Sequence, residues 1–171
     1  ARGVDGWLIA AVMALGALGD VLLDIDFMIG AIAFAAGHVV AMGLYRRNVR
    51  ARLTGSQKAL GMAVLIGVPL ISWLLTQKPE VAFYGLLLGG MAATAWTSRF
   101  PRYRTGLGAM MFAASDLLIF ARMGPLEGSL LASIGVWVLY FGGQYLIADG
   151  VIRTLDQAGR TDRTADIGSV A

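Results

Sequence analysis

Two aspartates lie inside apolar stretches that are long enough to cross a lipid bilayer. Asp20 belongs to the first such stretch, and Asp116 lies in a later one between small and branched apolar residues. A carboxylate within a membrane costs roughly 2.5 kcal/mol or more, so two of them indicate a function. Paired carboxyl groups can perform acid–base chemistry. We expect these two to face each other inside a helix bundle and to act on a lipid.

The composition predicts the kind of scaffold that holds them. Of the 171 residues, 57% are apolar and only 15% are charged, and the mean hydropathy is +0.70. A soluble domain usually has about 25% charged residues. The apolar stretches also lack the alternation of β-barrel strands. We therefore predict an all-α protein, a polytopic transmembrane helix bundle surrounded by the lipid bilayer.

Six apolar stretches are long enough to be spans. They are residues 6–23, 27–45, 59–76, 81–98, 105–121 and 128–149. We assign residues 1–153 to a single transmembrane helical bundle. Residues 154–171 are polar and of mixed charge, and we expect them to form a disordered cytoplasmic tail.

The basic residues predict the orientation of the bundle. If the N-terminus lies inside, 12 of the 14 Lys and Arg residues fall on that side, and only Lys78 and Arg122 fall on the other. The positive-inside rule then places both termini in the cytoplasm, and we expect the membrane to be a bacterial inner membrane. The net charge of +3 therefore reflects topology, and we expect no nucleic-acid partner.

The composition also limits the chemistry of the site. The sequence has no Cys, which excludes disulfides, cysteine-ligated metals and a thiol nucleophile. His38 is the only histidine, so a histidine-rich metal site is excluded as well. We expect neither a metal nor a cofactor.

Three other polar side chains are candidates for the same site. Asp20 and Asp116 lie ~5 Å and ~9 Å from the outer ends of their spans, and His38 lies deeper, near the midplane. Tyr140 and Gln144 are four residues apart and share one face of the last span. We predict that His38, Tyr140 and Gln144 orient water or the oxygen atoms of a substrate next to the two aspartates.

Each of these residues also has a purely structural interpretation. Asp116 could accept hydrogen bonds from hydroxyl groups such as that of Ser115, and Asp20 could be the polar end of a helix that reaches water. His38 could be a buried residue with its hydrogen bonds satisfied. The polar residues of the last span could simply link two helices.

Four motifs follow one another along the chain. The motifs are Leu18-Gly19-Asp20-Val21-Leu22-Leu23; Phe27-Met28-Ile29-Gly30 with Phe34, His38 and Tyr45; Gly108-Ala109-Met110-Met111-Phe112-Ala113-Ala114-Ser115-Asp116-Leu117-Leu118; and Trp137-Val138-Leu139-Tyr140 with Gln144-Tyr145-Leu146-Ile147. Taken in this order, they resemble the YhhN-like family of lysoplasmalogenases, and the resemblance covers about residues 8–152. Family members usually have about eight spans, with two before the Gly-Asp motif. We therefore expect that two N-terminal helices are missing here.

The resemblance implies hydrolysis of the vinyl ether bond of lysoplasmalogens. The products would be a fatty aldehyde and glycerophosphoethanolamine or glycerophosphocholine. A vinyl ether is hydrolysed by protonation of its β carbon, after which water attacks the oxocarbenium ion. This needs a protonated carboxyl and a carboxylate. We assign the deeper Asp116 as the acid and Asp20, nearer to water, as the carboxylate.

Other classes of protein also place aspartates in a membrane. A proton-coupled transporter would usually show paired internal repeats, which are not visible here. An intramembrane aspartyl protease would carry Gly-x-Gly-Asp, whereas the sequence reads Gly16-Ala17-Leu18-Gly19-Asp20. A non-catalytic lipid-binding protein is a further alternative. Because not every organism makes vinyl ether lipids, the substrate of this member stays open.

Overall fold

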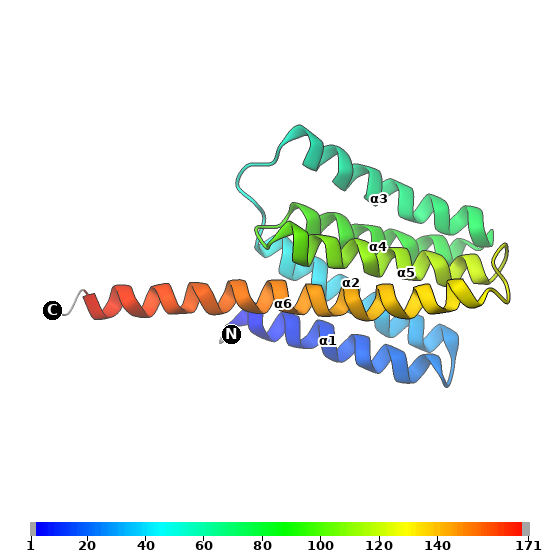
Figure 1. Ribbon diagram of the computed structural model, residues 1–171, viewed down its shortest axis with the longest axis horizontal. Helices are drawn as coiled ribbons and strands as arrows, with labels where there is room; N and C mark the ends of the chain where they lie inside the picture. Colours follow the sequence, from blue (N-terminus) through cyan, green and yellow to red (C-terminus); the bar gives the residue numbers. More distant parts are fainter. Residues whose placement is uncertain (1–2, 169–171) are drawn as a thin grey trace.

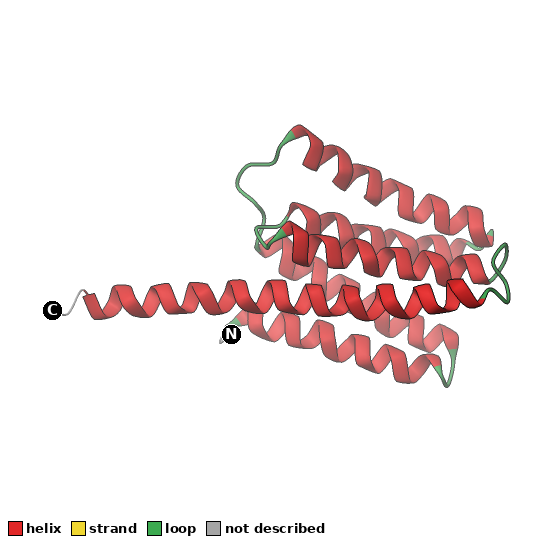
Figure 2. Cartoon of the chain, viewed as in Figure 1, coloured by secondary structure: helices red, strands yellow, loops and turns green. Residues whose placement is uncertain are grey.

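The protein is a bundle of six long helices (Figure 1). The computed structural model describes residues 3–168, with side chains described through Thr161. The helices are α1 (Val4–Leu23), α2 (Phe27–Arg47), α3 (Gly55–Thr76), α4 (Pro79–Thr97), α5 (Leu107–Arg122) and α6 (Leu130–Gly168). A short π-helical turn, η1 (Arg102–Gly106), leads into α5. Figure 2 shows helices joined by loops and turns, so the all-α prediction is confirmed.

Five helical segments are long and apolar enough to cross a membrane. They are Val4–Leu23, Phe27–Arg47, Gly55–Thr76, Arg102–Arg122 and Leu130–Thr161. Large apolar side chains such as Trp7, Leu131 and Phe141 also stay exposed on the outside of the bundle. A water-soluble fold rarely exposes apolar surface on this scale, whereas lipid tails cover it without cost. The chain is therefore an integral membrane protein.

Local signals in the sequence explain where several helices begin. Thr54 and Gln57 form a capping box at the start of α3, each side chain bonding the other residue's backbone N–H. The side chain of Asp26 accepts the backbone N–H of Ile29 at the start of α2. Pro79 occupies the first position of α4, where its missing N–H is tolerated. These local signals therefore fix where the three helices begin.

The short connections divide the bundle into two ends. Residues 24–26, 77–78 and 123–129 join helices at one end, which we call the turn end. The described stretches nearest both chain termini lie toward the opposite, terminal end (Figure 1). Among the described residues, Lys78 and Arg122 are the only basic ones at the turn end.

Glycine allows α5 and α6 to pack backbone against backbone. A Cβ atom on Gly108 would lie 2.7 Å from the carbonyl oxygen of Gly143, and a Cβ atom on Gly143 would lie 2.7 Å from the carbonyl oxygen of Gly108. Real Cβ atoms do not approach so closely. Any larger residue at either position would push the helices apart. This contact fixes the helix that carries Asp116 against the helix that carries Tyr140.

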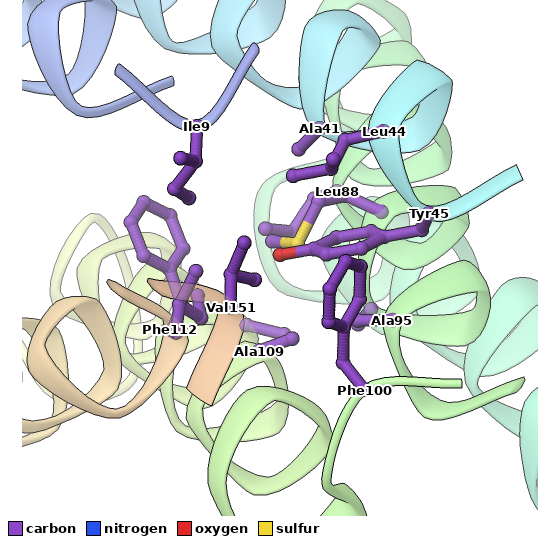
Figure 3. Packing of buried hydrophobic residues seen from close by; sticks show 14 of the residues in the cluster. Ile9, Ala41, Leu44, Tyr45, Leu88, Ala95, Phe100, Ala109, Phe112 and Val151 are labelled. Carbon is purple, nitrogen blue, oxygen red and sulfur yellow. The ribbon is translucent and has the colours of Figure 1, made fainter. Parts of the chain in front are cut away.

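The buried core fills the space between the helices on the terminal side of the two aspartates. Ile9, Leu44, Phe112 and Val151 belong to it, and they come from four different helices (Figure 3). Tyr45 packs edge-on against Phe100, with ring centroids 6.2 Å apart. Phe112 also belongs to the candidate site described below. The core therefore packs directly against that site on its terminal side.

The last helix is longer than the sequence suggested. We expected disorder from residue 154 onward, but α6 continues to Gly168 and extends past the rest of the bundle (Figure 1). Residues 154–168 contain no proline, and an ion pair between Arg153 and Asp149 stabilises the turn of α6 just before them. Residues 169–171 of the expected tail lie outside the described residues. The division into a bundle and a cytoplasmic tail stays a prediction.

Candidate active site

Asp20 and Asp116 line the same cavity. Its volume is about 440 Å³, and its walls come from α1, α2, α4, α5 and α6. Apolar side chains such as Ile32, Leu87 and Ile119 form most of the lining. The cavity therefore combines a large apolar surface with a small number of polar groups, as a site for an amphiphile would.

Asp116 is held by a chain of hydrogen bonds on α4 and α2. The carboxyl group is buried, and the Tyr84 hydroxyl donates to its Oδ2 atom at 2.7 Å. The Nε2 atom of His38 lies 3.1 Å from the same hydroxyl oxygen. We call His38, Tyr84 and Asp116 the buried triad. Its three members come from α2, α4 and α5, so it also ties these helices together.

Asp20 has a similar arrangement on the other side of the cavity. The Tyr140 hydroxyl donates to its Oδ2 atom at 2.7 Å. The Nε2 atom of Gln144 donates in turn to the Tyr140 hydroxyl oxygen at 3.4 Å, which is a weak hydrogen bond. We call Gln144, Tyr140 and Asp20 the half-buried triad, because Asp20 itself is only half-buried.

An aromatic layer separates the two triads. The Phe112 ring lies 5.4 Å from the His38 ring and 5.3 Å from the Tyr140 ring. Phe34 packs edge-on against Phe112 and Tyr140, both at 6.1 Å. The contacts with Phe34 and Phe112 hold the Tyr140 ring in place, so its hydroxyl group stays aimed at Asp20.

The five predicted site residues fall into two layers. Asp20, Asp116 and Tyr140 line the large cavity. His38 and Gln144 do not line it. They line a second cavity of about 20 Å³ behind the aromatic layer, which has room for roughly one water molecule. In this structure both residues therefore act on the aspartates through a tyrosine.

Sequence reasoning missed Tyr84, which lines the large cavity and binds Asp116 directly. Its position near the outer end of the predicted span 81–98 was the available signal. That position alone is ambiguous, because tyrosines near span ends commonly mark the membrane interface. The structural alternative for Asp116 also named Ser115, but the Ser115 hydroxyl donates to the Val136 carbonyl oxygen at 2.9 Å.

The described residues contain no group of three or more His, Cys, Asp or Glu side chains that could hold a metal ion. The polar groups of the two triads are two carboxyls, two phenols, an imidazole and an amide. Such a set can donate, accept and relay protons, and it can bind a water molecule. The arrangement is therefore suited to acid–base chemistry on an apolar ligand.

Comparisons with known proteins place the chain in a family. Residues 1–151 match the family described as the YhhN family. Proteins named lysoplasmalogenase from Mycobacterium bovis and Mycobacterium tuberculosis are each 30% identical to it over 159 residues, covering 84% of this chain and 59% of the relative. The chain thus spans less than two thirds of their length. No solved structure matches significantly. On this evidence, the chain belongs to the YhhN family, as its motifs predicted.

Proposed function

We propose that this protein hydrolyses the vinyl ether bond of a lysoplasmalogen, giving a fatty aldehyde and a glycerophospho-base. The observation that carries the proposal is that two membrane-embedded carboxyl groups line one largely apolar cavity. Two relatives are named lysoplasmalogenase, which supports the substrate class. The apolar walls would hold the hydrocarbon chain, and the carboxyl groups would flank the ether.

Asp116 is the proposed acid. In its protonated form it would transfer its proton to the β carbon of the vinyl ether, which turns the α carbon into an oxocarbenium ion. Burial supports this role, because a carboxyl group shielded from water donates to carbon without competition from solvent. Tyr84 holds the group at a fixed position against the cavity.

Asp20 is the proposed carboxylate. Its negative charge would stabilise the oxocarbenium ion and then accept a proton from the water that attacks the α carbon. The product of this step is a hemiacetal. Asp20 is half-buried and so keeps access to water, which suits it better than Asp116 for this role.

Breakdown of the hemiacetal returns both groups to their starting states. The protonated Asp20 would give its proton to the departing glycerol oxygen as the carbon–oxygen bond breaks. The ionised Asp116 would accept the proton of the hemiacetal hydroxyl as the aldehyde forms. One water molecule is consumed in total, and neither aspartate needs an external proton after the first cycle.

We further propose that both termini lie in the cytoplasm of a bacterium, with the turn end facing outward. In the part of the chain that the structure describes, the basic residues gather at the terminal end, and the turn end has only Lys78 and Arg122. Because the sequence has no Cys, single cysteines at positions 78 and 122 can be labelled selectively. Labelling by an impermeant reagent from outside intact cells is expected. Labelling only after the cells are opened would reverse the orientation.

Mass spectrometry of lipids tests the proposed reaction most simply. Purified protein should convert an added lysoplasmalogen into the fatty aldehyde and the glycerophospho-base. The saturated 1-alkyl analogue, which has no vinyl group to protonate, should remain intact. Turnover of both lipids, or of neither, would contradict vinyl ether hydrolysis.

A further inference from the structure

The large cavity carries two exposed charges that the proposed reaction does not use. Glu80 in the first turn of α4 and Arg122 in the last turn of α5 both line it. Both lie at the turn end, and Asp20 lies three residues before the end of α1. Asp116 precedes Arg122 by six residues, which corresponds to ~9 Å along α5. The two charges therefore mark one end of the cavity.

Neither charge has a partner among the described residues. No hydrogen bond or ion pair joins Glu80 or Arg122 to any described side chain, and they do not pair with each other. The charge of each side chain suits its position in the helix, because acidic groups are favourable near helix N-termini and basic groups near C-termini. That preference does not require the two side chains to line one cavity. Their position there calls for a further explanation.

The distribution of charge in the cavity restricts how an anionic lipid can enter. Of the Asp, Glu, Lys and Arg residues, four line the cavity: Asp20, Glu80 and Asp116 are acidic, and Arg122 is the only cation. A phosphate placed beside the two aspartates would be repelled by any ionised carboxylate. Beside Arg122, the same phosphate gains a planar donor group that can bind two of its oxygens. A phospholipid is therefore held in only one direction, with its head group at the turn end.

We propose that Arg122 and Glu80 form the head-group site for a zwitterionic lysophospholipid. Arg122 binds the phosphate, and Glu80 binds the ammonium group of the base. The glycerol unit then reaches from Arg122 toward Asp116, and the hydrocarbon chain occupies the apolar part of the cavity. The assignment rests on the proposed hydrolysis for its substrate, but the binding site itself is defined by the charges of the cavity.

Substrates that differ only in the head group test this site. Three lipids would be compared: a 1-alkenyl-glycerophosphoethanolamine, the corresponding 1-alkenyl-glycerophosphate, and the 1-alkenylglycerol without phosphate. For Arg122→Gln, we expect kcat/KM for the glycerophosphoethanolamine to fall relative to that for the alkenylglycerol by about tenfold or more, mainly through KM. For Glu80→Gln, the preference for the glycerophosphoethanolamine over the glycerophosphate should fall by a factor of about three or more.

The turn end offers matched controls. Lys78 is also a cation at that end, and Glu127 is also an exposed carboxylate, but neither lines the cavity. Lys78→Gln and Glu127→Gln should leave both ratios unchanged. If Arg122→Gln lowers kcat/KM equally for the lipids with and without phosphate, the charge acts on the fold or on membrane insertion, and the head-group assignment is wrong.

A binding measurement separates this proposal from the proposed reaction. Binding of the saturated 1-alkyl-glycerophosphoethanolamine and of 1-alkylglycerol would be measured in detergent, so that no turnover is needed. Arg122→Gln should weaken binding of the first lipid by about tenfold while the second changes little. This result would support the head-group site even if the protein cleaved no vinyl ether. Equal binding of the first lipid by wild type and variant would overturn the site even if cleavage occurred.

Discussion

The two halves of the candidate site use the same chemical parts in different surroundings. On each side a tyrosine hydroxyl donates to an aspartate at 2.7 Å, and a nitrogen atom lies behind the tyrosine. Asp116 is buried, whereas Asp20 is half-buried. The nitrogen belongs to the imidazole of His38 behind Asp116, but to the amide of Gln144 behind Asp20. The halves therefore differ in solvent access and in the third residue.

The third residue of each triad, Gln144 or His38, determines which group is the donor in each hydrogen bond. The Gln144 amide nitrogen can only donate, so the Tyr140 hydroxyl, which has one proton, must donate to Asp20. That arrangement favours Asp20 as a carboxylate. The imidazole nitrogen of His38 can either donate or accept, depending on its tautomer. The Tyr84 hydroxyl group can therefore donate a hydrogen bond to an ionised Asp116 or accept one from a protonated Asp116.

This contrast suggests that the residues hydrogen-bonded to the two tyrosines, His38 and Gln144, determine which aspartate acts as the acid and which as the carboxylate. The buried triad tolerates both protonation states of its carboxyl group, as an acid that is repeatedly discharged requires. The half-buried triad stabilises one state. Substitutions that remove or exchange these parts test the comparison, beginning with those of largest effect.

Replacing Asp116 should have the largest effect. Asp116→Asn keeps the shape of the side chain but cannot donate a proton to carbon, so cleavage of the vinyl ether should be abolished. Asp24→Asn, in an exposed connection at the turn end, is the control and should be fully active. Activity would be measured by aldehyde release, with helical content checked by circular dichroism. Activity of Asp116→Asn close to that of wild type would return Asp116 to a structural role.

Replacing Asp20 should be severe but less complete. Asp20→Asn removes the charge that stabilises the oxocarbenium ion, and we expect kcat to fall by about 10²-fold or more. Some turnover should remain, because the acid is intact and water can attack without a base. Single-turnover measurements would show whether the chemical step has slowed. A loss confined to KM would instead assign Asp20 to substrate binding.

The tyrosines should matter less than the aspartates they hold. Tyr84→Phe and Tyr140→Phe each remove one hydroxyl group that donates to a carboxyl group, and we expect losses of roughly tenfold in kcat. Tyr84→Phe also disconnects His38 from Asp116, so it should alter the pH profile of kcat more than Tyr140→Phe does. Identical pH profiles for the two variants would remove the distinction between the triads.

Exchanging the third residues should produce the smallest effects. His38→Gln gives the buried triad the donor that the half-buried triad has, and Gln144→His does the reverse. If the direction of the hydrogen bonds matters, each exchange should lower kcat by about three- to tenfold, a cost near 1 kcal/mol. His38→Leu and Gln144→Leu provide the reference for simple loss of the bond. An exchange with no effect on kcat would show that the direction is unimportant.

The sequence predicted the scaffold well because membrane helices leave a strong signal. The helical and apolar character of the chain was visible in composition and in the length of its apolar stretches. The extent of α6 was not predicted, because a polar helix that leaves the bundle resembles a disordered segment in composition. Leu155 packs against the core, but most residues of that stretch are polar, so its composition does not reveal the packing.

The site was predicted in part. Asp20 and Asp116 were conspicuous because a charge in an apolar stretch is expensive, and they line one cavity. The positions of His38 and Gln144 could not be predicted from the sequence. They depend on the packing of Phe34 and Phe112, which line the smaller cavity together with His38 and Gln144. Tyr84 was missed because its partner is 32 residues away in the sequence, on another helix.

Hydrolysis in D₂O tests the central claim most directly. If the reaction begins with transfer of a proton to the β carbon of the vinyl ether, one deuterium should appear on the carbon next to the aldehyde group. Turnover in D₂O should also be slower than in H₂O. The aldehyde would be reduced to the alcohol as it forms, which prevents later exchange, and then analysed by mass spectrometry. An alcohol without deuterium at that carbon would contradict protonation of carbon, and with it the acid role of Asp116.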